Sequence, residues 1–181
     1  MITFPLSLTA NWQYANRLAT LSAAEQDWLL EPGSLTAKLK SYAQHFAVKV
    51  LSEQPFDLSQ SQQLLLKTTQ SQALNREVLL LCDDQPMVYA QSWIPTSARL
   101  KQQNLLTMGT KPLGDVIFQD PTLMRTAIEV AQLDTDHSVQ QLVTALTLSV
   151  QPLWARRSVF SLENNHFLVS EIFLPGAYIY L

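Results

Sequence analysis

One stretch of this sequence, residues 74–93, constrains the fold more than any other, because it has the pattern of a β-hairpin. Two mainly apolar runs, Leu74–Cys82 and Met87–Trp93, flank Asp83-Asp84-Gln85-Pro86. Aspartate favours turns through its side-chain hydrogen bonds, and proline does so through its fixed φ. We therefore expect two antiparallel strands joined by these four residues.

A second hairpin is predicted near the C-terminus. Its strands are Trp154–Leu162 and His166–Leu174, with Glu163-Asn164-Asn165 as the turn. Hairpins without a regular alternation of strands and helices predict an α+β fold, in which helices pack on an antiparallel sheet. A chain of 181 residues is long enough for one substantial core, so we expect a single domain over residues 1–181.

The rest of the chain carries shorter signals. A capping box at Ser22 and Glu25 predicts a helix through Leu30, and Ser34 can cap a second helix. Further elements are expected at His45–Glu53 (strand), Gln54–Gln72 (short helix or loop), Ser97–Asn104 (short helix), Pro112–Phe118 (helix), Leu123–Ala131 (strand) and Asp136–Val150 (amphipathic helix).

Two charged residues interrupt otherwise apolar strand faces. Arg76 alternates with aliphatic residues in the first hairpin, and Glu171 alternates with aromatic and aliphatic residues in the second. A charge on an apolar face is costly unless it is paired or meets a ligand. The pattern alone therefore leaves two interpretations open: a structural ion pair within the sheet, or a polar small-molecule pocket with both charges at its wall.

Composition argues against several classes of function. The net charge of −3 disfavours a general surface for nucleic acid or anionic membranes. The single cysteine, Cys82, rules out an internal disulfide and fits a reducing compartment. No apolar run approaches the ~20 residues that span a bilayer, and the N-terminal residues lack the pattern of a secretory signal. A cytoplasmic location is therefore the default expectation.

Signals of common catalytic chemistry are missing. His45, His137 and His166 lie far apart and lack metal-ligand spacing. The sequence has no P-loop, no nucleophile elbow and no G-x-G-x-x-G motif, and its 4 glycines make phosphate-cradling loops improbable. Any enzyme here is expected to work without metal, nucleotide or covalent intermediate.

Some groups could still bind an anion. The helix starts at Leu35 and Leu113 would present main-chain N–H groups, which suit a carboxylate, although such a terminus more often faces water. Arg156 and Arg157 are neighbours in a predicted strand, so they point to opposite faces. One of them could line a basic pocket, and the spacing does not say which.

Several short blocks of residues occur in the order known from one enzyme family. They are Asp27–Leu30, Ser34–Thr36, Arg76–Cys82 with Pro86 and Trp93, Lys111–Gly114, Leu153–Ser158 and Ser170–Pro175. Together they resemble the chorismate–pyruvate lyase (chorismate lyase) family, which makes 4-hydroxybenzoate for bacterial ubiquinone biosynthesis. The resemblance covers most of residues 25–176, and its blocks are specific only in combination.

The resemblance implies a fold and a reaction. The fold is a sheet of about six antiparallel strands with flanking helices and helical flaps over a buried ligand. The reaction converts chorismate to 4-hydroxybenzoate and pyruvate without a cofactor or metal. Its partners would be this small-molecule substrate and product, with no nucleic acid and no integral membrane segment. A monomer is the default expectation.

The resemblance also implies site residues. It carries ligand contacts over to Arg76, Leu113 and Glu171, and to Leu35, where the family motif can hold methionine. Arg76 would bind the ring carboxylate and Glu171 would meet the ring hydroxyl, so these two are the expected catalytic residues. We expect Arg156 or Arg157 to receive the second carboxylate of chorismate, on its enolpyruvyl group.

Two further expectations remain. Residues 132–151 look longer than the family's usual link, which predicts a family-atypical insertion. The alternative function is a non-catalytic domain of the same fold that binds a small aromatic acid as a sensor or carrier, as in some bacterial transcription regulators. The sequence shows no obvious helix-turn-helix or basic stripe, which speaks against a regulator.

Overall fold

The computed structural model describes residues 2–18, 21–102 and 104–181, and within them eight strands pair into one sheet. The order is β1-β6-β7-β8-β4-β3-β2, β5 pairs with β7, and every pair is antiparallel. The strands are β1 (Gln13–Tyr14), β2 (Phe46–Asp57), β3 (Gln72–Cys82), β4 (Gln85–Pro95), β5 (Met124–Arg125), β6 (Glu129–Leu133), β7 (Leu153–Leu162) and β8 (Asn165–Phe173). The expected α+β class is confirmed, and the expectation of about six strands is wrong because the sheet is larger.

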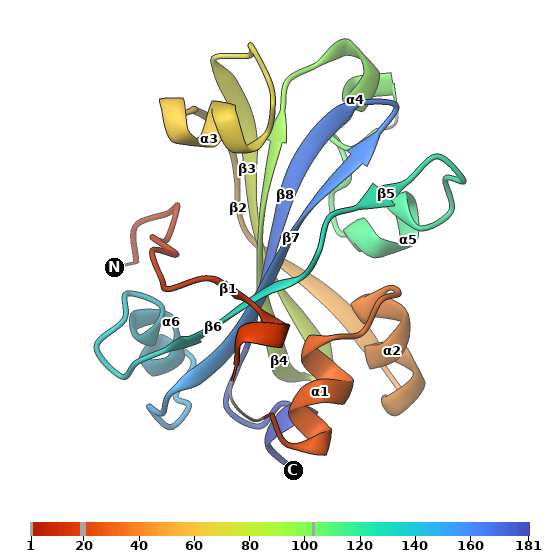
Figure 1. Cartoon of the computed structure of the whole chain (residues 1–181). Coiled ribbons are helices and arrows are strands. Elements are labelled where there is room, and N and C mark those ends of the chain that lie inside the picture. The colour runs from red at the N-terminus through yellow and green to blue at the C-terminus, as the bar shows by residue number, and fades with distance from the viewer. Residues whose placement is uncertain (1, 19–20, 103) are drawn as a thin grey trace.

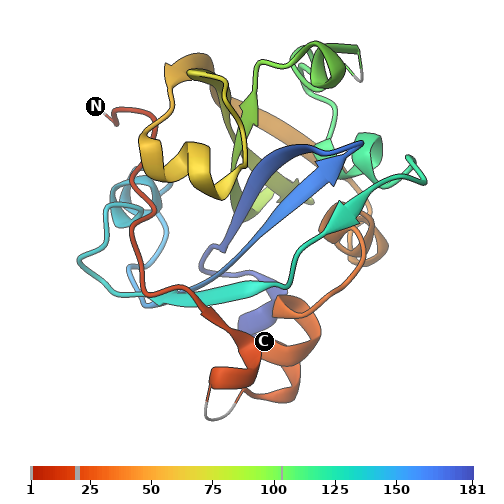
Figure 2. The same ribbon diagram turned by 45° about the horizontal axis from the view of Figure 1, so that its top comes forward.

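Helices cover both faces of this sheet (Figures 1 and 2). On one face lie α1 (Ala23–Leu29), α2 (Leu35–Tyr42), α4 (Ala98–Gln102) and α5 (Leu113–Ile117). On the other lie α3 (Gln60–Leu65) and α6 (Gln140–Ala145). Two 3-10 turns, η1 (Ala15–Arg17) and η2 (Tyr178–Tyr180), complete the elements. No helix among the described residues has the length and apolar character needed to cross a membrane.

Both hairpins are confirmed, but their turns are shorter than expected. Each turn has two residues, Asp83-Asp84 and Glu163-Asn164, and all four residues have φ between 47° and 64°. Two successive residues at positive φ give the twist that suits a tight antiparallel hairpin. Gln85, Pro86 and Asn165 therefore belong to the strands.

The predicted helix starts at Ser22 and Ser34 are confirmed. Ser22 and Glu25 form the reciprocal capping box of α1, and the Ser34 side chain accepts a hydrogen bond from the Ala37 N–H at the start of α2. In the expected helix at Ser97–Asn104, α4 is confirmed, while Gln103 lies outside the described residues.

The predicted helix over Asp136–Val150 is largely wrong, because only the six residues of α6 are helical. Neither Asp136 nor Ser138 caps it, since Val139 is the N-cap residue. The Ser138 hydroxyl instead donates to the Ser7 carbonyl at 2.6 Å, which ties the N-terminal segment to this region. Thr147, at φ 57°, follows the end of the helix. Whether residues 132–151 are an insertion stays a prediction.

The predicted strand Leu123–Ala131 is correct only in part, because the chain leaves the sheet between β5 and β6. Arg125 pairs with Phe160 on β7, and Glu129 pairs with Arg157. The four residue steps from Arg125 to Glu129 therefore lie opposite the three steps from Phe160 to Arg157 on β7, as in a β-bulge with one extra residue. Arg125 therefore lies on the face of Phe160, whereas Glu129 lies on the opposite face with Arg157.

Candidate functional site

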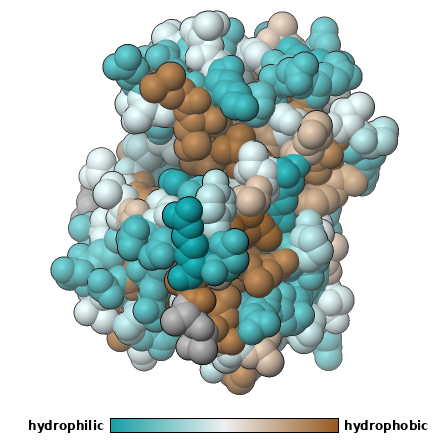
Figure 3. Space-filling model, in the orientation of Figure 1, coloured by the Kyte–Doolittle hydropathy of each residue, from teal (hydrophilic) through white to brown (hydrophobic). Residues whose placement is uncertain are grey.

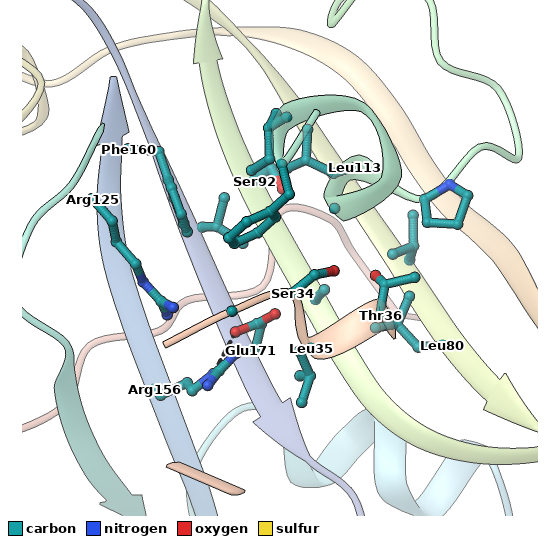
Figure 4. A pocket seen from close by; sticks show the side chains of 18 of the residues that line it. Ser34, Leu35, Thr36, Leu80, Ser92, Leu113, Arg125, Arg156, Phe160 and Glu171 are labelled. Carbon is teal, nitrogen blue, oxygen red and sulfur yellow. Dashed lines mark hydrogen bonds and ion pairs between the residues drawn. The ribbon is translucent and has the colours of Figure 1, made fainter. Parts of the chain in front are cut away.

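A cavity that is partly open to solvent lies between the centre of the sheet and the starts of α2 and α5, and its empty space together with its open mouth is about 540 Å³ (Figure 4). Its floor includes Ala90 and Ser92 on β4. Ala90 pairs with Glu171 on β8, and Ser92 pairs with Arg76 on β3. Small side chains on the central strand, between larger neighbours, leave room for a flat ligand above the sheet.

Arg76 lies at the cavity wall, and only 2% of its surface is exposed to solvent. Its Nε donates to a Glu53 carboxylate oxygen at 2.9 Å. Its Nη2 donates to the carbonyls of Gly109 and Lys111 at 2.8 and 3.1 Å, so Arg76 also holds the segment that leads into α5. Burial lowers the pKa of this guanidinium, and the charge and hydrogen bond of Glu53 oppose that shift.

Glu171 and Arg156 form an ion pair at the opposite wall. The Arg156 Nε donates to a Glu171 oxygen at 2.6 Å, and the relative exposures of the two side chains are 1% and 15%. Arg156 Nη1 also donates to the carbonyls of Trp28 and Leu29 at the end of α1 and of Glu31 just after it. Both charges in the strand faces are therefore paired, and both also line the cavity.

Arg76 and Glu171 do not pair with each other. They lie on β3 and β8, and β4 runs between those strands. Two strand spacings separate their backbones by about 10 Å across the sheet. The site therefore presents a guanidinium and a carboxylate on opposite sides of one small floor, an arrangement that suits an elongated ligand with an acidic group at one end and a hydrogen-bond donor at the other.

The starts of α2 and α5 meet above this floor, and both Leu35 and Leu113 line the cavity. The Ser34 hydroxyl caps the Ala37 N–H, and Pro112 makes no side-chain cap at α5. The first N–H groups of both helices thus lie beside the cavity, where they suit a carboxylate. The expected helix at Pro112 is confirmed, although it begins one residue later, at Leu113.

Gly114 allows the two helices to approach this closely. A Cβ atom at Gly114 would lie 2.6 Å from the Ser34 Oγ and 3.0 Å from the Thr36 Oγ1. Ser34 cannot swing away without losing its cap of α2. An ion pair between Lys40 and Asp115, at 2.6 Å, joins the same helices further along.

We expect Gly114→Ala to lower the free energy of unfolding by about 1–3 kcal/mol, because a methyl group there overpacks the contact between α2 and α5. Urea denaturation measures this loss. Gly33→Ala is the matched control, since a Cβ at Gly33 would meet only the flexible Glu31 carboxylate, at 3.1 Å. Equal stability of the Gly114 and Gly33 variants would contradict this account of the contact.

Arg125 is a cavity residue that the sequence did not reveal as a site residue. Its guanidinium lies 5.0 Å from the centre of the Phe160 ring. Burial and the positive charge of Arg156 lower its pKa to about 10, and the charges of Glu171 and Glu31 oppose that shift. Regular alternation along one strand would place Arg125 and Glu129 on the same face. The extra residue between β5 and β6 puts them on opposite faces, and no local sequence pattern indicates it.

Arg157 points to the face away from the cavity. Its Nε donates to Glu129 at 2.8 Å, and its guanidinium lies 4.7 Å from the centre of the Trp12 ring. Of the two adjacent arginines, only Arg156 lines the cavity.

An apolar patch over α3, including Leu64 at 73% exposure, also lies on the sheet face away from the cavity (Figure 3).

Within the described residues, no three His, Cys, Asp or Glu side chains gather closely enough to hold a metal ion. The expectation of chemistry without metal or cofactor stays a prediction. Cys82 is fully buried, and its thiol lies 3.8 Å from the Leu39 carbonyl. Burial raises the pKa of this thiol.

Comparison with protein families and known proteins gives consistent matches. The family model described as "Chorismate lyase" matches residues 6–181. A protein of Pseudoalteromonas translucida (strain TAC 125) named "Probable chorismate pyruvate-lyase" is 63% identical over 180 residues, which are 99% of this chain and 100% of that protein. A protein of the same name from Psychromonas ingrahamii is 44% identical over 181 residues, with 98% and 96% of the two chains covered.

Solved structures share the fold at low sequence identity. The effector domain of PhnF from Mycobacterium smegmatis matches with a TM-score of 0.60 at 14% identity, over 78% of this chain and 88% of that one. The C-terminal domain of the histidine utilization repressor from Pseudomonas syringae matches with a TM-score of 0.53 at 12% identity, over 73% and 92%. Such matches establish architecture and leave function to the site.

Proposed function

The chain belongs to the chorismate lyase family, and on this premise we propose that it converts chorismate to 4-hydroxybenzoate and pyruvate. One observation of the site carries the proposal. Arg76 and Glu171 lie on opposite sides of the cavity, and the small side chains of Ala90 and Ser92 form the floor between them. A ring with a carboxylate at one end and a hydroxyl at the other would lie between them.

The reaction rearranges atoms that chorismate already carries. The bond between the ring and the ether oxygen breaks, and its electron pair leaves with the side chain. The ring carbon that bears the hydroxyl loses its hydrogen, so the ring becomes aromatic. The methylene carbon of the side chain gains one hydrogen and becomes the methyl group of pyruvate. No oxidant or reductant is needed, so the protein contributes mainly orientation and stabilisation of charge.

Three charged groups that line the cavity have roles in this proposal. The Arg76 guanidinium would bind the ring carboxylate as a forked donor, together with main-chain N–H groups at Leu35 or Leu113. Glu171 would accept a hydrogen bond from the ring hydroxyl. Arg156 would hold the Glu171 carboxylate in its orientation, since it already donates a hydrogen bond to it.

The helices above the floor would act as the flaps. α2 and α5 meet over the cavity through Gly114, so a ligand would enter and leave when they separate. We further propose that the product supplies ubiquinone biosynthesis. The monomeric state and the cytoplasmic location expected from the sequence stay predictions.

A direct assay tests the proposed function. Purified, chelator-treated protein is mixed with chorismate, and 4-hydroxybenzoate and pyruvate are quantified by chromatography. We expect equal amounts of both products. Binding of 4-hydroxybenzoate without turnover would favour the alternative of a sensor or carrier, a function compatible with the structural likeness to regulator domains. If the protein neither binds 4-hydroxybenzoate nor converts chorismate, the proposed function is wrong.

A further inference from the structure

Arg125 gives the cavity a positive charge that the protein does not neutralise by a direct ion pair. Three arginines line the cavity. Arg76 pairs with Glu53 and Arg156 pairs with Glu171. Among the described residues, no carboxylate forms an ion pair with Arg125, whose hydrogen bonds go to neutral oxygens. An unpaired, half-buried guanidinium beside a cavity is costly unless a ligand brings the matching charge.

The contacts of Arg125 aim part of its guanidinium at the cavity. The Nε donates to the Ser158 hydroxyl at 3.0 Å, and the Nη1 donates to the carbonyls of Glu31 and Pro32 at 3.1 and 3.2 Å. The Nη2 has no such bond among the described residues. Figure 4 shows the guanidinium reaching toward Glu171 and Arg156, beside the Phe160 ring. The side chain is therefore held in place with donors left for a ligand.

The other arginines are less suited to a second carboxylate. The charge of Arg156 is already paired with the Glu171 carboxylate, whereas Arg125 has no such partner among the described residues. Arg157 lies on the opposite face of the sheet, paired with Glu129. Arg76 lies on β3, across β4 and β8 from the β5–β7 side of the site.

We propose that Arg125 binds the enolpyruvyl carboxylate of chorismate, which rests on the function proposed above. Chorismate brings two carboxylates to the site, and 4-hydroxybenzoate keeps only one of them. With Arg76 on the ring carboxylate, the second carboxylate meets Arg125 on the far side of Glu171. Arg125 thereby distinguishes substrate from aromatic product, because its ligand group leaves with pyruvate.

The difference between substrate and product supplies the test. We expect Arg125→Gln to lower kcat/KM for chorismate by about 100-fold, the effect of removing one partner of a desolvated charge pair. The Kd of 4-hydroxybenzoate, measured by calorimetry, should change by less than about 3-fold, because the product lacks the group that Arg125 binds. Arg125→Lys keeps the charge and should recover part of the loss.

Arg157→Gln is the matched control, since it removes an arginine from the neighbouring strand on the opposite face. It should leave both kcat/KM and Kd unchanged. Circular dichroism and thermal unfolding establish that each variant is folded. If Arg125→Gln is not folded, Arg125→Lys carries the comparison, because a lysine retains charge but loses the forked geometry.

Three outcomes would overturn the assignment of Arg125. One is an equal loss of chorismate turnover and product binding, which would mean that Arg125 only holds the Glu31–Pro32 connection. Another is wild-type kcat/KM in the Gln variant. If the wild type binds chorismate without turning it over, the proposed function fails, and displacement of 4-hydroxybenzoate by chorismate then tests Arg125 separately. Equal displacement from the wild type and from Arg125→Gln is the third outcome.

Discussion

Replacing Arg76 by alanine should lower kcat/KM for chorismate by about 1,000-fold and weaken the binding of 4-hydroxybenzoate as well. Removing one partner of a buried, hydrogen-bonded charge pair costs about 2–5 kcal/mol, and about 1.4 kcal/mol corresponds to a factor of ten. Both ligands carry the ring carboxylate, so both should lose affinity, in contrast to the selective loss expected at Arg125. Steady-state kinetics and calorimetry on the same preparation measure the two effects.

A second variant separates the ligand-binding role of Arg76 from its structural role. Arg76 also binds Glu53 and the carbonyls that precede α5. Glu53→Gln removes the ion pair and leaves the guanidinium in place, and Glu53 is partly exposed. We expect this variant to keep at least about a tenth of the wild-type kcat/KM, because the guanidinium stays bound to the carbonyls of Gly109 and Lys111 and remains available to the ligand. Wild-type turnover by Arg76→Ala would remove Arg76 from the site.

Glu171→Gln should lower kcat by about 100-fold or more, with a smaller change in KM. A glutamine retains the shape but loses the charge that would hold the ring hydroxyl and accept a proton, and general-base catalysis contributes about 10²–10⁴-fold. The variant also leaves Arg156 without its carboxylate partner. Steady-state kinetics over a range of chorismate concentrations separates kcat from KM. A kcat near that of the wild type would exclude an obligatory base.

An isotope label decides where the hydrogen travels. Chorismate with deuterium on the ring carbon that bears the hydroxyl is turned over in ordinary water, and the methyl group of pyruvate is analysed by mass spectrometry. Loss of the label to water would support transfer through Glu171. Full retention of the label in the methyl group would favour direct transfer within the substrate and leave Glu171 as an orienting group.

Local sequence patterns predicted the residues at the cavity walls well. Period-two alternation placed Arg76 and Glu171 on apolar strand faces, and both line the cavity. Serine caps and a proline predicted the helix starts at Leu35 and Leu113, since these signals act within one helical turn. The functional roles of these four residues stay predictions, because geometry places a side chain without showing what it binds.

Long-range pairing was beyond the reach of these patterns. Alternation showed that Arg156 and Arg157 face opposite ways, but only the strand partners show which one faces the cavity. Glu171 lies opposite Arg156, and Glu129 lies opposite Arg157. The extra residue between β5 and β6 hid Arg125 for the same reason, because a bulge is defined by the strand beside it. The ion pair of Arg76 with Glu53 likewise joins strands whose register no local signal fixes.

The position of β4 has a consequence for how the protein is made. β4 forms the floor of the cavity, and it lies between β3, which precedes it in the chain, and β8, which is nearly the last segment. During synthesis the β3–β4 hairpin emerges early with one apolar edge open, and that edge is closed only when residues 165–173 leave the ribosome. Exposed strand edges pair readily with other chains. We therefore expect a truncation before β8 to leave this edge of β4 open and to cause aggregation rather than to form a partial binding site.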